Sequence, residues 1–242
     1  MELNVGILMI GSLYWDEGRR KDWRAARLSA ESEYTITAPI RYGRKSRGGT
    51  YTTVFSSSAP LGTAKVLRCK NPIGSAEELI AEAEYLWMAE RLSDRANHKI
   101  SAAWGCVALL VNPASQIPKS VISGWDRHVR QAQDYGRVPQ GPGEEPLVTD
   151  AGIMQLPWPL LLDQNIPVPV DLLLTSITHP TLEGDAHSYA TPEAIAAGWG
   201  ADASDEVRYF RNNRAHGIRT FEDDAILEEL RRNFPQVGET VA

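Results

Sequence analysis

The stretch VGILMIGSLYW at residues 5–15 decides how this sequence is expected to fold. Residues 5–10 are all apolar, and Gly11 and Ser12 follow at once. A short apolar run that ends in a turn signal is typical of a strand buried on both faces of a sheet. The run is too short to cross a membrane and has no basic leader, so we expect neither a membrane span nor an export signal.

Outward from this stretch, other short apolar runs bounded by Gly, Pro, Ser or Asn predict further strands. They cover residues 33–36, 51–56, 62–69, 103–111 and 170–177. Several of these strands follow one another without a long helix between them. This order favours an α+β fold with a barrel-like sheet over a doubly wound parallel sheet.

Helices are expected mainly in the second half of the chain. Their predicted ranges are 75–92, 120–135, 191–198, 204–217 and 220–233. The first has the clearest start, because Ser75 followed by Glu78 is a capping-box pattern. Residues 136–152 are rich in Pro and Gly and are expected to form a long surface loop or lid.

The composition indicates a folded domain with small-molecule partners. Of 242 residues, 43% are hydrophobic and 23% charged, and the formal net charge is −6. An acidic chain is poorly suited to coating a polyanion, so we expect no nucleic-acid partner. Cys69 and Cys106 have no metal-ligand spacing and are expected to be buried thiols in a cytoplasmic protein.

Glu84, in the predicted helix 75–92, is the leading candidate for acid–base chemistry. The apolar face of that helix is formed by Ala76, Leu79, Ile80, Ala83, Leu86 and Trp87. Glu78 and Glu82 should point away from this face, whereas Glu84 lies at its edge. A carboxylate beside apolar groups is desolvated and can transfer protons near neutral pH.

Alternatives to a catalytic Glu84 remain open. Glu84 could sit on the rim of the apolar face and pair with an arginine. Glu90 projects still nearer the centre of that face, although its place near the helix end also suits an ion pair with a nearby arginine.

Other polar clusters allow two interpretations each. Arg41, Arg44, Lys45 and Arg47 could clasp a carboxylate, a phosphate or RNA, or could form a solvated loop. His179, Glu183, Asp185 and His187 superficially resemble metal ligands, but their spacing matches no zinc signature, so we expect no metal. The Gly11-Ser12-Leu13 turn offers backbone N–H groups to a ligand, or is simply a turn.

Three segments together resemble the γ-glutamylcyclotransferase superfamily. Gly11, Ser12, Leu13 and Trp15 match its Tyr-Gly-Ser-Leu turn and the Trp that follows, with Ile10 in the Tyr position. The segment IAEAE at residues 80–84 is similar to the family's Leu-Asp-x-x-Glu segment, with Ala81 in place of Asp. The segments SYATPEAI and NNRAHGIRTFEDDAILEEL are similar to its closing segments.

This resemblance implies a small mixed β-barrel flanked by helices, formed as one domain by residues 1–242, with an enlargement at about residues 100–150. It implies that Glu84 is catalytic and that Gly11, Ser12, Leu13 and Tyr189 bind substrate, without cofactor or metal. The implied reaction cyclises a γ-glutamyl amide to 5-oxoproline and releases an amine. A non-catalytic binding or regulatory protein on the same fold is the alternative.

Overall fold

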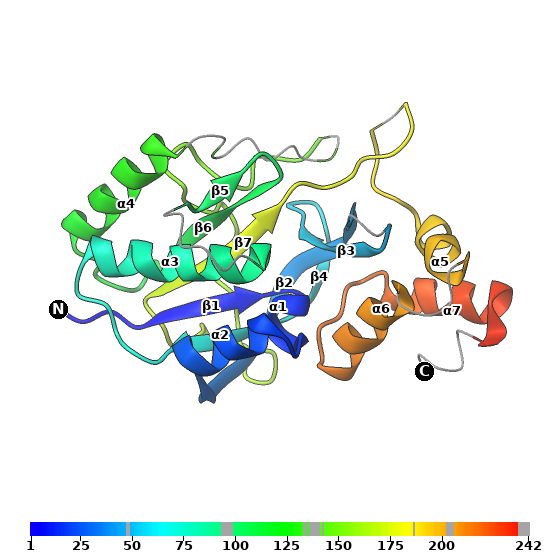
Figure 1. Cartoon of the computed structure of the whole chain (residues 1–242), viewed down its shortest axis with the longest axis horizontal. Coiled ribbons are helices and arrows are strands. Elements are labelled where there is room, and N and C mark those ends of the chain that lie inside the picture. The colour runs from blue at the N-terminus through cyan, green and yellow to red at the C-terminus, as the bar shows by residue number, and fades with distance from the viewer. Residues whose placement is uncertain are drawn as a thin grey trace.

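The computed structural model describes residues 1–46, 49–92, 99–132, 135, 141, 143–185, 187–201 and 206–236, with the backbone alone at 200, 201 and 206. Within these residues, the strands form one seven-stranded mixed sheet in the order β3-β2-β4-β1-β7-β6-β5 (Figure 1). The strands are β1 (Val5–Met9), β2 (Leu28–Lys45), β3 (Tyr51–Phe55), β4 (Leu61–Cys69), β5 (Ser101–Ala102), β6 (Gly105–Val111) and β7 (Leu172–Thr178). The α+β class is therefore confirmed.

The described residues also form helices. They are α1 (Ser12–Trp15), α2 (Arg19–Arg27), α3 (Ala76–Arg91), α4 (Lys119–Gln131), α5 (Pro192–Ala201), α6 (Glu206–Ala215) and α7 (Asp223–Asn233). The predicted cap of α3 is confirmed, because the Ser75 hydroxyl accepts a hydrogen bond from the Glu78 N–H at 3.2 Å. None of the described helices combines the length and apolarity that a membrane crossing needs.

Strand β1 lies in the middle of the sheet, as its continuous apolar sequence predicted. It pairs with β4 in antiparallel and with β7 in parallel orientation. Val5, Ile7 and Met9 pack into the apolar cluster beneath α3 and α4, whereas Leu8 packs into the cluster on the opposite face. The pleat of the strand thus divides its side chains between two cores.

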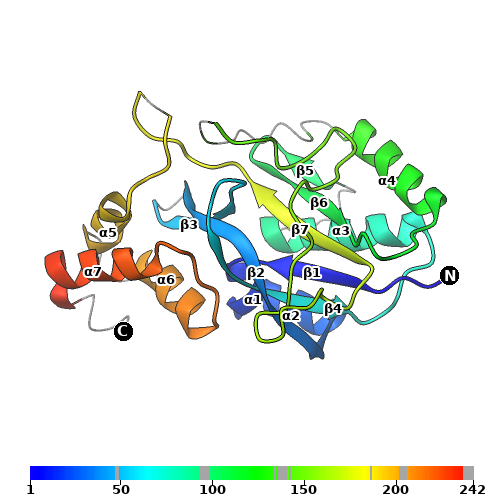
Figure 2. The same ribbon diagram turned by 180° about the vertical axis from the view of Figure 1, so that it is seen from behind.

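The two faces of the sheet are covered by different kinds of structure. Helices α3 and α4 cover one face, with Trp87 and Trp125 fully buried beneath them (Figure 1). Residues 143–171 cross the opposite face (Figure 2), where Met154 and Val168 are buried. The predicted enlargement at about 100–150 therefore supplies part of the main sheet and of both cores.

Strand β2 is far longer than the predicted strand at 33–36 and changes partners along its length. Up to Pro39 it pairs with β4, and from Ile40 onward it pairs with β3. Its register with β3 shifts between Tyr42 and Arg44, which marks a bulge. The strand therefore curves, and β3 is brought close to β7.

The sheet nevertheless stays open and is not the closed barrel that we expected. Among the described residues, the ladder of hydrogen bonds begins at β3 and ends at β5, and these two edges do not pair. Strand β5 has only two residues, and the other edge lies against the C-terminal helices. Tyr42 and Tyr51 pack with Trp199 and Phe210 of those helices, so this edge of the sheet is covered by helices.

Candidate functional site

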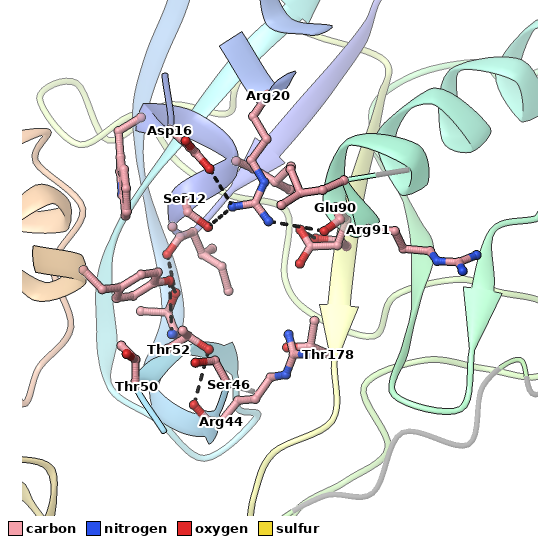
Figure 3. A pocket seen from close by; sticks show the side chains of 18 of the residues that line it. Ser12, Asp16, Arg20, Arg44, Ser46, Thr50, Thr52, Glu90, Arg91 and Thr178 are labelled. Atoms are coloured by element: carbon pink, nitrogen blue, oxygen red, sulfur yellow. Dashed lines mark hydrogen bonds and ion pairs between the residues drawn. The ribbon is translucent and has the colours of Figure 1, made fainter. Parts of the chain in front are cut away.

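A pocket of about 670 Å³ opens where β1 ends and α1 begins (Figure 3). Its walls come from α1, the last turn of α3, the facing ends of β2 and β3, β7 and α6. Its described lining consists of Leu8, Ile10, Gly11, Ser12, Leu13, Trp15, Asp16, Arg20, Arg44, Ser46, Thr50, Thr52, Thr53, Glu90, Arg91, Leu92, Trp104, Thr175, Ser176, Thr178, Arg208 and Tyr209. Three of the predicted substrate-binding residues, Gly11, Ser12 and Leu13, are in this lining.

The turn at Gly11 is held rigidly by its neighbours. The Thr53 hydroxyl donates to the carbonyl of Ile10 at 2.5 Å and lies 2.8 Å from the Tyr209 hydroxyl. A Cβ atom at position 11 would lie 2.0 Å from that Tyr209 oxygen, so only glycine fits. Trp15 adds a further link, because its indole N–H donates to the Asn213 side chain at 2.7 Å. The turn is therefore fixed from both β3 and α6.

Arg20 joins the turn to the end of α3. Its guanidinium donates to the Ser12 hydroxyl, to the Asp16 carboxylate at 3.4 Å, and to the backbone carbonyls of Ala89 at 3.3 Å and Glu90 at 3.2 Å. The side chain is only 11% exposed. Carbonyls of a last helical turn lack partners within the helix, and an arginine that binds them also opposes the negative end of the helix dipole. Arg20 thus holds Glu90 next to the Gly11 turn.

Glu90, the rival candidate in the sequence, is the acid of α3 that reaches the pocket. Its carboxylate accepts a hydrogen bond from the Ser176 hydroxyl at 3.3 Å. Within the described chain this is the single hydrogen bond to that carboxylate, so oxygen lone pairs remain for a ligand. Glu90 and Arg44 face each other across the pocket (Figure 3).

Glu84 is half-buried on the same helix and is not in the described lining of the pocket. At about 100° per residue, the offset of six residues from Glu84 to Glu90 places the two acids roughly 120° apart around the helix axis. The structure therefore brings Glu90, and not Glu84, together with the Gly11 turn. Glu82, which was expected to point away from the core, is instead buried and forms an ion pair with Arg27.

The basic cluster at 41–47 is divided among different environments, and its first three residues lie on β2 instead of a loop. Arg41 forms an ion pair with buried Glu222 at 2.6 Å, and Lys45 is exposed. Arg44 points into the pocket with its guanidinium 4.8 Å from the centre of the Trp104 ring. Arg47 lies outside the described residues.

Tyr189 lies apart from the pocket. Its hydroxyl donates to the Glu144 carboxylate at 2.7 Å, and the Arg41 guanidinium lies 4.2 Å from the centre of its ring. Burial, and then the contact with Glu144, raise the pKa of this phenol. In this structure Tyr189 therefore anchors the segment around Glu144.

The remaining candidates also lie outside the lining. Glu183 accepts a hydrogen bond from the Tyr51 hydroxyl at 2.5 Å. Burial, and then the charge of Arg44, lower the pKa of His179. In the part of the chain that the structure describes, no three His, Cys, Asp or Glu side chains are arranged to hold a metal ion. Cys69 and Cys106 are both buried, as predicted, and neither forms a disulfide.

Sequence reasoning missed several parts of the pocket. Arg20 belongs to α2, whose polar sequence gave no strong helical signal, and Tyr209 and Thr53 approach from distant parts of the chain. A comparison of the chain with protein-family models, with curated proteins and with solved structures finds no match to any of them.

Proposed function

We propose that this chain is a γ-glutamylcyclotransferase-like enzyme in which Glu90 is the general acid and base. The observation that carries the proposal is that the Glu90 carboxylate shares one pocket with the Gly11-Ser12-Leu13 turn. In this proposal the curved sheet is an opened form of the barrel expected from the resemblance. The approach of β3 to β7 supports that view.

The reaction needs little from the protein beyond positioning and proton transfer. The α-amine of a γ-glutamyl group attacks its own γ-carbonyl carbon, a new C–N bond closes the five-membered ring, and the amide C–N bond to the leaving amine breaks. Because the nucleophile is tethered to the carbonyl, effective concentration supplies much of the rate. A carboxylate is still needed to take the proton from the attacking nitrogen and return one to the leaving nitrogen.

Glu90 meets the requirements for that carboxylate. It is half-buried, the Ser176 hydroxyl orients one of its oxygens, and Arg20 fixes the backbone that carries it. The backbone N–H groups of the Gly11 turn would polarise the reacting carbonyl. The rigid support of this turn by Thr53 and Tyr209 favours such preorganisation.

The test measures 5-oxoproline release from a panel of γ-glutamyl amides that differ in the leaving amine. Glu90→Gln is expected to lower kcat by about 100-fold or more, the range for loss of a general acid–base group. Glu77→Gln on the exposed first turn of α3 is the matched control and should retain full activity. Circular dichroism and thermal unfolding establish that each variant is folded.

Glu84→Gln separates the two candidate acids. Loss of activity in this variant, with activity kept in Glu90→Gln, would transfer the acid–base role to Glu84 and overturn the assignment to the pocket. Absence of 5-oxoproline release by the unmodified protein from every amide would overturn the enzymatic proposal. The non-catalytic binding protein would then be the remaining interpretation.

A further inference from the structure

We infer that Arg44 is the binding site for a carboxylate group of the ligand, so that the pocket selects small monoanionic carboxylates. This inference deepens the proposed function by assigning the substrate class and the group that recognises it. It rests on the proposed function for the identity of the reaction. The observations that support the inference concern the surroundings of Arg44 and not the Gly11 turn.

The side chain of Arg44 is held in place without a counter-ion. Its guanidinium stacks on Trp104, and Trp104 in turn stacks on the fully buried Trp87, with ring centres 4.8 Å apart and planes inclined by 23°. Within the described chain, no carboxylate forms an ion pair with Arg44. A planar guanidinium with a fixed orientation and unused N–H donors is suited to bidentate binding of a carboxylate.

Arg41 on the same strand shows what a charge-paired arginine looks like in this protein. It lies three residues earlier, and its guanidinium is neutralised by Glu222 at 2.6 Å. Among the carboxylates of the described residues, Glu90 across the pocket is the one whose charge acts on Arg44. Burial lowers the pKa of Arg44, and the Glu90 charge acts in the opposite direction. An incoming carboxylate would supply the missing partner.

The charge of the lining also favours an anion. The described lining carries four arginines, Arg20, Arg44, Arg91 and Arg208, against the two carboxylates of Asp16 and Glu90. This excess of positive charge occurs in a chain whose formal net charge is −6. Because Arg20 is already bonded to Ser12, Asp16 and two carbonyls, Arg44 is the half-buried cation left for the ligand.

Glu90 limits the kind of anion that fits. A ligand bound between Arg44 and Glu90 can place one negative charge at the guanidinium, but a second charge would approach the Glu90 carboxylate. A monoanionic carboxylate with an amide or amine at the other end matches these two groups. The hydroxyl of Thr178, which also lines the pocket, can donate a further hydrogen bond to the carboxylate.

The test compares the binding of 5-oxo-L-proline, an anion at neutral pH, with that of its neutral amide, 5-oxo-L-prolinamide, by isothermal titration calorimetry. The two probes differ almost only in the carboxylate. We expect the protein to bind the anion about tenfold or more tightly, the range for a charge-assisted hydrogen-bonded pair. Arg44→Gln should remove this preference, and Arg44→Lys should keep part of it.

Lys45→Gln is the matched control, since it removes a neighbouring positive charge from the exposed side of the same strand. It should leave the preference unchanged. Equal binding of the two probes, no binding of the anion, or an unchanged preference in Arg44→Gln would each overturn the inference. Inorganic phosphate is a third probe, and displacement of 5-oxo-L-proline by phosphate at equal concentration would reassign the site to a phosphate-bearing ligand.

These outcomes are distinguishable from failure of the proposed function. If the protein prefers the anion through Arg44 but releases no 5-oxoproline from any amide, the reaction is wrong and the carboxylate site stands. If it turns over γ-glutamyl amides with a KM that Arg44→Gln leaves unchanged, the reaction stands and the carboxylate site is wrong.

Discussion

The guanidinium of Arg20 donates one hydrogen bond to the backbone carbonyl of Glu90 and another to the side chain of Ser12. A single side chain from α2 therefore sets the separation between the end of α3 and the turn after β1. These two elements carry the proposed acid and the proposed carbonyl-binding turn.

Arg20→Lys is expected to separate catalysis from binding. Lysine keeps the positive charge but cannot reach Ser12, Ala89 and Glu90 together, because it lacks the planar fork of donors. We expect kcat for 5-oxoproline release to fall about tenfold or more while KM changes little. Lys21→Ala is the control, since Lys21 is exposed and pairs with Glu17 at 2.5 Å. Equal changes in KM and kcat, or none, would show that Arg20 does not position Glu90.

Gly11→Ala is expected to destabilise the protein mainly because the new methyl group would clash with the hydroxyl oxygen of Tyr209. The new Cβ would lie 2.0 Å from the Tyr209 hydroxyl, and overpacking of this kind costs about 1–3 kcal/mol. The thermal midpoint should fall by several degrees for a chain of this size. Gly74→Ala should have little effect, because the nearest atom to its Cβ would be 3.7 Å away.

Tyr209→Phe tests whether that oxygen causes the destabilisation. Phenylalanine removes the hydroxyl, so the double variant Gly11→Ala with Tyr209→Phe should be more stable than the sum of the single effects predicts. Additive effects in urea unfolding would show that the hydroxyl is not what excludes a side chain at position 11.

Arg41→Met is expected to destabilise the protein in a way that depends on pH. Burial raises the pKa of Glu222 above its usual value of 4.5, and Arg41 opposes this shift. A raised pKa in the folded state means that the stability contributed by Glu222 is greatest at low pH and declines as the pH rises through the folded pKa. Without Arg41 the charged form is buried and unpaired, which costs about 3–5 kcal/mol.

The loss of stability in Arg41→Met should therefore be larger at pH 8 than at pH 5, as measured by urea unfolding at both values. The double variant Arg41→Met with Glu222→Gln removes the charge that is left unpaired and should recover much of the loss at pH 8. A loss that does not vary with pH would show that Arg41 stabilises by packing alone, for example through its contact with the Tyr189 ring at 4.2 Å.

Secondary structure was predicted correctly from the sequence where burial produces a regular pattern of apolar residues. Residues 5–10 and 62–69 were predicted as strands, and both form strands, because their apolar patterns reflect buried positions in a sheet. The start of α3 was predicted from Ser75 and Glu78 because a cap depends on residues close in sequence. Strand β2 was underestimated because Ser32, Arg41 and Arg44 give it a polar sequence, and pairing first with β4 and then with β3 overrides that local preference.

The candidate acid could not be selected from the helical pattern alone. Glu84 and Glu90 both adjoin apolar residues, and their difference arises from what lies opposite each of them in space. Glu90 faces Arg44 and adjoins Ser176, which are separated from it by 46 and 86 residues and belong to other strands. Side-chain periodicity describes one helix, whereas a pocket is made by the elements that meet around it.

The hydrogen bond from Trp15 to Asn213 spans 198 positions of the chain. During synthesis the N-terminal strand and the turn after it leave the ribosome long before α6 exists, so the turn initially lacks one of its two supports. The cavity can be completed only after α6 has been synthesised, and any ligand-dependent property of the protein should therefore emerge in nascent chains once Asn213 has left the exit tunnel.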